Sequence, residues 1–463
     1  MRKDVVRMDK QQLNYEFISI ISESHPGLTF EEYRDSCVFL LFYHYLCLKY
    51  DDDLEDQYKL SAMVRMAVRG KLQMPSFLRF IDQASSFIHM AGCEVLLTDL
   101  SFYQRLLKVH QIEKQKSYAR FFRKLIKKID AWDCDDYMVS LYGDLFEKLL
   151  AEFARARKES FVSREMVRLY KMMFEHAEAE IRRAFLPDFK YGVLLKPMLS
   201  GQDDPEIFGY DDTETYGEIL RILCYMKGIP KKSIHLYDKT RWMEEADFQE
   251  YFDAVSIFAP EGVESGQYIS SVPQWHPVHQ FMNSGTKGEL PMILSALPLL
   301  SENGVMAVVI PSALLYREGK EAQIRRYLVE EAGCLEAIMM LPDHIFHSTG
   351  QNEVLLFLQK NREHSDIMFF DCSEMDDLDE EKLDLISRSW KERESVSGFC
   401  AAVEVDLIRK NDYNLNLPRY ITKLMKLTEV DLKAKLDRIA EIDRELIDIE
   451  HKISMYRRDL ELN

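Results

Sequence analysis

The run Val305-Met306-Ala307-Val308-Val309-Ile310 indicates the class of fold, because six successive apolar residues are typical of a strand buried within a sheet. Helical stretches separate it from further short apolar runs between about residues 185 and 372. These runs are Ile207–Tyr210, Ser233–Leu236, Ala254–Ile257, Leu335–Met339 and Val354–Leu358. Strands that alternate with helices predict an α/β domain whose mostly parallel sheet is covered by helices on both faces.

Helical patterns flank this region on both sides. From the start to about residue 160, apolar residues recur at helical spacing with few strand signals, which predicts an all-helical N-terminal domain. The acidic segment Asp371–Glu381 is interpreted as a solvated turn that leaves the sheet, because its acids lack the spacing of a calcium loop. The expected domains are residues 1–160, 161–400 and 401–463.

The C-terminal segment after Pro418 is predicted to be helical, with a heptad seam of apolar residues. The seam consists of Ile439, Ile442, Leu446, Ile449, Ile453, Tyr456 and Leu460, at alternating steps of three and four. A seam of this kind needs a partner helix. We expect that helix to belong to another chain; packing against its own chain is the alternative.

Composition excludes several classes of protein. A chain of 463 residues with 47% hydrophobic residues predicts two or three globular domains. We expect a cytoplasmic protein without a membrane-bound segment, because no signal-peptide core and no run of about 18 uncharged apolar residues is found. The eight cysteines stand singly, which favours buried free thiols over disulfides or a zinc site.

The net charge of −18 argues against nucleic-acid binding by overall electrostatics, so any contact with DNA must be local or shared with a partner. One local candidate lies between Gln104 and Lys128, where nine basic residues face one acidic residue, Glu113. The candidate DNA-binding residues within it are Lys114, Lys116, Arg120, Arg123, Lys124, Lys127 and Lys128. The alternative is an ordinary solvated face of a helix.

Four segments carry a resemblance to a known family. They are Ala296–Pro311, Leu341–Phe346, Phe161–Val167 and the stretch Asn411-Asp412-Tyr413-Asn414-Leu415-Asn416-Leu417-Pro418-Arg419-Tyr420. They resemble the modification subunit of type I restriction-modification systems, an adenine-N6 DNA methyltransferase. The resemblance implies a class I, Rossmann-like methyltransferase domain between a helical domain and a helical tail. It also implies that the tail, from Ile439 to Leu460, docks on a specificity subunit.

The family binds S-adenosylmethionine with a glycine-rich turn, Asp-Pro-(Ala/Thr)-Cys-Gly-Ser-Gly-Gly. The corresponding stretch here is Val193–Gln202, in which Lys196 replaces the aspartate and only Pro197 and Gly201 remain. Asp211 matches the acid that holds the cofactor's ribose, and Asp238 matches the acid that faces its adenine ring. Both also fit ordinary acids at strand ends. The missing glycines favour a chain without bound S-adenosylmethionine, with cofactor binding as the alternative.

The catalytic motif of the family is Asn-Pro-Pro-(Tyr/Phe), and the matching positions are Phe258, Ala259, Pro260 and Glu261. Phe258 has no acceptor for the amino group of a flipped adenine, and Glu261 has no ring on which the base can stack. We therefore expect no intact catalytic residues.

Two functions remain open. The chain is either an inactive methyltransferase-fold subunit that acts in assembly and DNA binding, beside a specificity subunit and an active modification subunit, or an active adenine-N6 DNA methyltransferase with divergent motifs. A module that binds S-adenosylmethionine without using it lies between the two.

Overall fold

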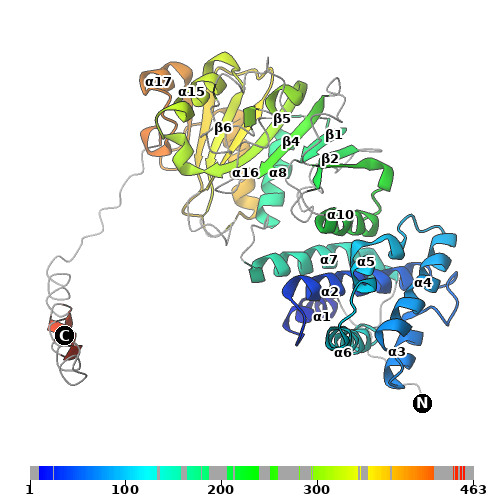
Figure 1. Cartoon of the computed structure of the whole chain (residues 1–463). Coiled ribbons are helices and arrows are strands. Elements are labelled where there is room, and N and C mark those ends of the chain that lie inside the picture. Colours follow the sequence, from blue (N-terminus) through cyan, green and yellow to red (C-terminus); the bar gives the residue numbers. More distant parts are fainter. Residues whose placement is uncertain are drawn as a thin grey trace. The chain divides into compact units, whose positions relative to one another are not determined.

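The computed structural model describes residues 10–132, 136–157, 164–186, 206–238, 251–258, 293–342 and 353–421, apart from short gaps within these ranges. It also describes Phe281, Ile345 and a few residues of the tail between 442 and 453. The chain divides into two compact units, Met1–Ile421 and Thr422–Asn463. Figure 1 shows the first unit as a group of helices next to a large sheet.

The N-terminal region is helical, as predicted. Its elements are α1 (Lys10–Ser19), η1 (Ile20–Ser22), α2 (Phe30–Lys49), α3 (Leu60–Val68), α4 (Met74–Met90), η2 (Leu97–Asp99), α5 (Ser101–Leu107), α6 (Ile112–Ile129) and α7 (Asp136–Arg157). Helix α2 is the central helix, because its side chains are buried from Tyr33 to Cys47. Thr29 and Glu32 form a capping box that satisfies backbone N–H groups at its start.

The sheet has nine strands in the described part of the chain, in the order β3-β2-β1-β4-β5-β7-β6-β8-β9. Their bounds are β1 (Arg183–Leu186), β2 (Glu206–Asp211), β3 (Ile234–Asp238), β4 (Phe252–Phe258), β5 (Leu300–Pro311), β6 (Leu335–Met340), β7 (Glu353–Gln359), β8 (Asp366–Asp371) and β9 (Cys400–Glu404). Strands β1 to β6 and β8 run parallel, while β7 and β9 are antiparallel to their neighbours. The predicted mostly parallel sheet is therefore confirmed.

Helices cover both faces of this sheet. The remaining elements are α8 (Arg164–His176), α10 (Glu214–Met226), η3 (Lys231–Ser233), η4 (Leu297–Leu299), η5 (Ser312–Leu315), α15 (Lys320–Arg326), η6 (Tyr327–Glu331), α16 (Glu380–Glu392), α17 (Val405–Lys410) and η7 (Leu417–Arg419). Helices α8, α10 and α16 share one apolar core with one face of the sheet and with the N-terminal helices. Elements η5, α15, η6, α17 and η7 share the second core with the other face.

One prediction about the sheet was wrong. The acidic segment Asp371–Glu381 does not leave the sheet, because it connects β8 to α16, and the chain then returns as the edge strand β9. Residues of β9 alternate only weakly between buried and exposed, since one side of the strand pairs with β8 and the other is an edge. Its two alanines give no strong strand signal.

Two further predictions concern composition. The seven cysteines that the structure describes are free and buried, as expected. Among the described residues, no helix combines the length and the apolar character needed to cross a membrane.

Candidate functional site

The carboxyl edge of the parallel strands is where an open α/β sheet binds its ligands. Strands β2 and β3 end at Asp211 and Asp238, which are register partners on neighbouring strands. Strand β4 ends at Phe258 on the same edge, because it runs parallel to β1 and β5. The fold therefore brings the backbone of three predicted site residues to one edge of the sheet. Their side chains lie outside the described residues.

The other predicted residues of this site lie outside the described residues altogether. They are Pro197, Gly201, Ala259, Pro260 and Glu261. Strand β1 ends at Leu186, so the connection to β2 begins at Pro187, several residues before the stretch matched to the cofactor turn. The roles predicted for Pro197 and Gly201 thus stay predictions.

Two buried hydroxyl groups lie beneath this edge and were not singled out in the sequence. Ser256 is two residues before Phe258 on β4, and Tyr170 comes from α8 on the covering face. Neither hydroxyl oxygen has a hydrogen bond that meets normal geometry with a described residue. Burial raises the pKa of Tyr170, although the Ser256 hydroxyl opposes the shift, so the phenol stays neutral.

Helix α10 connects the cofactor edge to the N-terminal helices. It begins three residues after Asp211, and its Glu218 carboxylate accepts hydrogen bonds from the backbone N–H of Ser101, at 2.5 Å, and from the Ser101 hydroxyl, at 2.6 Å. Near its end, the Tyr225 hydroxyl lies 2.6 Å from that of Tyr50. Just after the helix, Lys227 forms ion pairs with two acids of α7. No local sequence signal predicts these contacts, because their partners are far apart in the chain.

The predicted basic stretch lies mainly on α6, and the structure divides its side chains into two groups. Lys114, Lys124 and Lys128 form ion pairs with Glu32 or Glu23, which precede or begin α2. Burial raises the pKa of Glu23, but the hydrogen bonds and charges of Lys124 and Lys128 outweigh it, so that the pKa is lowered.

The second group of basic residues faces outward. Lys116, Arg120 and Lys127 are exposed and recur at helical spacing, so they form a stripe on α6. Lys116 pairs with Glu113 on the same helix, and Arg123 is half-buried with its Nε donating to the carbonyl of Ala119. The stripe is the part of the predicted DNA-binding set that is accessible to a phosphate backbone.

The apolar seam of the tail is exposed at the positions that the structure describes. Ile442, Leu446, Ile449 and Ile453 are helical, and their exposed fractions lie between 42% and 52%. The other seam residues, Ile439, Tyr456 and Leu460, lie outside the described residues.

The order of the first seven strands, together with acidic residues at the carboxyl ends of β2 and β3, defines a class I methyltransferase-like fold. A solved methyltransferase subunit of a type I restriction-modification system from Streptococcus thermophilus has this fold, with a TM-score of 0.74 at 21% identity over 90% of this chain and 100% of that one. A modification subunit from Vibrio vulnificus, assigned to a type I restriction enzyme, gives a TM-score of 0.62 at 15% identity, over 90% of this chain and 100% of that one.

The model of the N-6 DNA Methylase family matches residues 138–428, and the chain belongs to this family. The methylase subunit of the type I restriction enzyme MpnII from Mycoplasma pneumoniae is 30% identical over 197 residues, which cover 40% of this chain and 36% of that one. The corresponding MjaVII subunit from Methanocaldococcus jannaschii is 24% identical over 69% of this chain and 60% of that one. The chain thus spans less than two thirds of the length of these relatives.

Proposed function

We propose that this protein is a modification-subunit-like member of a type I restriction-modification system that has lost methyl transfer and acts in DNA binding and complex assembly. The observation that carries the proposal is the sequence at the end of β4. This strand lies between β1 and β5 and ends at Phe258, and Ala259, Pro260 and Glu261 follow it. The agreement between the strand end and the motif position supports the comparison of these residues with Asn-Pro-Pro-(Tyr/Phe).

The chemistry of adenine methylation needs groups that these residues lack. The exocyclic amino group is a poor nucleophile unless an amide and a carbonyl oxygen accept its hydrogens, and the flipped base must stack on an aromatic ring. A phenylalanine at position 258 accepts no hydrogen bond, and a glutamate at 261 provides no ring. Two separate requirements are therefore unmet.

The second candidate function is an active adenine-N6 methyltransferase with divergent motifs. The observation that favours it is the pair Asp211 and Asp238, which are register partners at the ligand-binding edge of the sheet. Two acids at these strand ends suit the ribose and the adenine of S-adenosylmethionine. Cofactor binding without catalysis is compatible with the same pair.

Assembly and DNA binding follow from two other surfaces. The seam Ile439–Leu460 suits a helix of a specificity-type subunit, because its described apolar residues are exposed. The stripe of Lys116, Arg120 and Lys127 suits a DNA backbone, whose phosphates attract accessible cations. An active modification subunit in the same complex would then carry out methylation.

Methyl transfer tests the proposal directly. The purified chain is incubated with radiolabelled S-adenosylmethionine and genomic DNA that lacks adenine methylation, and the label in DNA is counted. We expect counts equal to a blank without protein, while a known active adenine methyltransferase labels the same DNA. Label transferred by this chain alone, and found in N6-methyladenine after digestion, rejects the inactive subunit and establishes the enzyme.

Calorimetric titration with S-adenosylmethionine separates the remaining alternatives. Heat that saturates at one cofactor per chain, and disappears in the variant Asp211→Ala, indicates cofactor binding through the predicted acid. The triple change Phe258→Asn, Ala259→Pro and Glu261→Phe restores the catalytic motif. We expect it to stay inactive, because Lys196 still replaces the family's aspartate in the cofactor turn.

A further inference from the structure

A large cavity lies at the sheet edge opposite Asp211 and Asp238. It has a volume of about 1360 Å³ and is enclosed by α8 and α16. Asp253 near the start of β4, Glu302 near the start of β5 and Gln359 at the end of antiparallel β7 also line it. We call it the amino-edge cavity, because it lies at the amino ends of the parallel strands. It exceeds the roughly 300–1,000 Å³ of typical small-molecule sites.

The described lining of the amino-edge cavity is acidic. Nine carboxylates face five lysines and arginines, so the wall favours a cationic ligand. The acids are Glu175, Glu178, Glu180, Asp253, Glu302, Glu336, Glu363, Glu380 and Asp384. Glu302 and Asp384 lie on different walls, and both are exposed.

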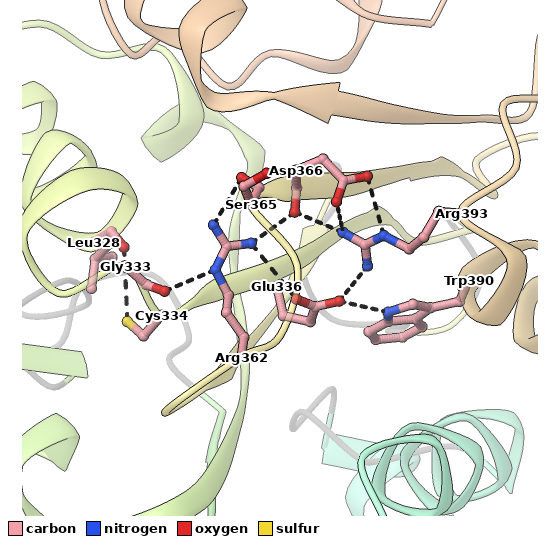
Figure 2. A network of polar contacts seen from close by, with 9 residues as sticks. All are labelled: Leu328, Gly333, Cys334, Glu336, Arg362, Ser365, Asp366, Trp390 and Arg393. Carbon is pink, nitrogen blue, oxygen red and sulfur yellow. Dashed lines mark hydrogen bonds and ion pairs between the residues drawn. The ribbon is translucent and has the colours of Figure 1, made fainter.

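One of these acids is buried and incompletely bonded. Glu336 on β6 is only 3% exposed, and Figure 2 shows it between Arg362 and Arg393. Its Oε1 accepts hydrogen bonds from Trp390 Nε1, at 3.1 Å, and from Arg393. Its Oε2 accepts no hydrogen bond from a described residue; Arg362 Nη1 forms an ion pair with it at 3.7 Å, which is too long for one. A hydrogen-bond acceptor in the cavity wall is thus left for a ligand.

A second acceptor lies close by. The ring of His176 packs at 4.6 Å from that of Trp390, and both residues line the cavity. Burial lowers the pKa of His176 to about 4, and the charges of Arg393, Lys391 and His364 add to this shift. The imidazole is therefore neutral at pH 7, and one of its ring nitrogens accepts hydrogen bonds. A ligand with several N–H donors and a positive charge satisfies both groups.

We propose that the amino-edge cavity binds the guanidinium or ammonium groups of a basic segment in a protein partner. The acidic lining supplies charge complementarity, which guides recognition, and the Oε2 atom of Glu336 supplies an unfilled acceptor. A volume above that of small-molecule sites suits several side chains of a segment better than one free amine. This site is separate from the cofactor edge and does not depend on whether the chain methylates DNA.

Fluorescence anisotropy with the full chain tests this site. The probes are a labelled peptide of alternating arginine and glycine, the same peptide with glutamate for arginine, and spermidine as a competitor. We expect saturable binding of the arginine peptide only, weakened by salt. The double variant Glu302→Gln/Asp384→Asn should weaken it about tenfold, because it removes two charges from the cavity wall. Glu336→Gln should weaken it further if its unfolding temperature is unchanged.

The matched control is Glu381→Gln/Glu404→Gln, which removes two exposed acids of α16 and β9 that do not line the cavity. Its affinity for the arginine peptide should equal that of the unchanged protein. Equal weakening by the control and the cavity variant would overturn the site, since the binding would then follow net charge alone. Failure of the peptide to bind, or binding of spermidine alone within the cavity, would overturn the assignment to a protein partner.

Discussion

Arg393 joins three elements through a single side chain. Its guanidinium donates to both carboxylate oxygens of Asp366 on β8, at 3.2 and 2.8 Å, and to Glu336 on β6, while its backbone ends α16 (Figure 2). Its backbone is left-handed, with φ of 52°, a conformation that non-glycine residues rarely adopt. The ion pairs with buried carboxylates compensate for that conformation and hold the helix end on the sheet.

We expect Arg393→Ala to lower the free energy of unfolding by roughly 2–3 kcal/mol, because a buried carboxylate loses its partner while Arg362 still compensates part of its charge. Urea unfolding followed by circular dichroism measures the change. The control Arg388→Ala removes an exposed arginine from the same helix and should stay within about 0.5 kcal/mol of the original protein. Equal decreases in the two variants would contradict a structural role for the network.

His44 makes stability depend on pH. It is buried on α2 with Nδ1 2.9 Å from the Tyr142 hydroxyl, and burial lowers its pKa to about 3. The unfolded chain takes up this proton near pH 6.5, whereas the folded chain does not until about pH 3. Stability is therefore complete above pH 6.5 and is lost as pH falls below it, by up to about 1.4 kcal/mol per pH unit.

The variant His44→Gln keeps a polar group near Tyr142 and removes the titration. Its free energy of unfolding should fall less steeply between pH 6.5 and 5 than that of the original protein, in urea titrations at each pH. Some dependence should remain, because His176 also has a lowered pKa. Identical slopes for the two proteins would show that His44 is not the group responsible.

Helix α6 shows how one basic run serves two purposes. Lys114 and Lys128 pair with acids near α2 and hold the helices together, while Lys116, Arg120 and Lys127 face outward. Net basic charge alone does not distinguish these groups in a sequence, because both fall within the same eighteen-residue helix. Their separation depends on which face of α6 packs on its neighbours.

Changing Lys116, Arg120 and Lys127 to glutamine should weaken binding of the chain to a short DNA duplex while stability stays the same. The slope of log affinity against log salt should flatten by about 0.9 for each phosphate that the variant no longer neutralises. Anisotropy titrations at several salt concentrations measure it. The matched change of Lys114 and Lys128 to glutamine should instead lower stability through their ion pairs. An unchanged slope after removal of the stripe would identify it as ordinary surface.

The strands that were predicted are those whose apolar runs are local and complete. Strand β1 was missed because it has four residues and begins with Arg183, whose guanidinium packs 4.7 Å from the ring of Phe208 and 5.5 Å from that of Phe252. The acids Asp211 and Asp238 were identified because each ends a recognisable strand. The hydrogen bonds between Ser101 and Glu218 could not be predicted, since these residues are 117 positions apart.

The division of the whole chain at Ile421 has a consequence for assembly. Ile421 is buried in the second core of the first unit, and its apolar contacts close that unit. The seam residues of the second unit have no such cover at their described positions. Apolar side chains that repeat along an exposed helix gain free energy when a partner helix removes them from water.

Removing the residues after Thr428 should therefore abolish binding to a specificity-type subunit and leave the rest folded. Co-purification of the two chains measures the binding, and the unfolding temperature checks the fold. Because the truncation removes all tail chemistry, the double variant Leu446→Lys/Ile449→Lys tests the seam itself, since a charge in the seam cannot be buried against a helix. The control Glu445→Lys/Glu450→Lys adds a larger change of charge at exposed tail positions outside the seam and should bind normally. Persistent co-purification of the truncated chain would mean that assembly uses the first unit, and failure of the control to bind would point to charge instead of apolar packing.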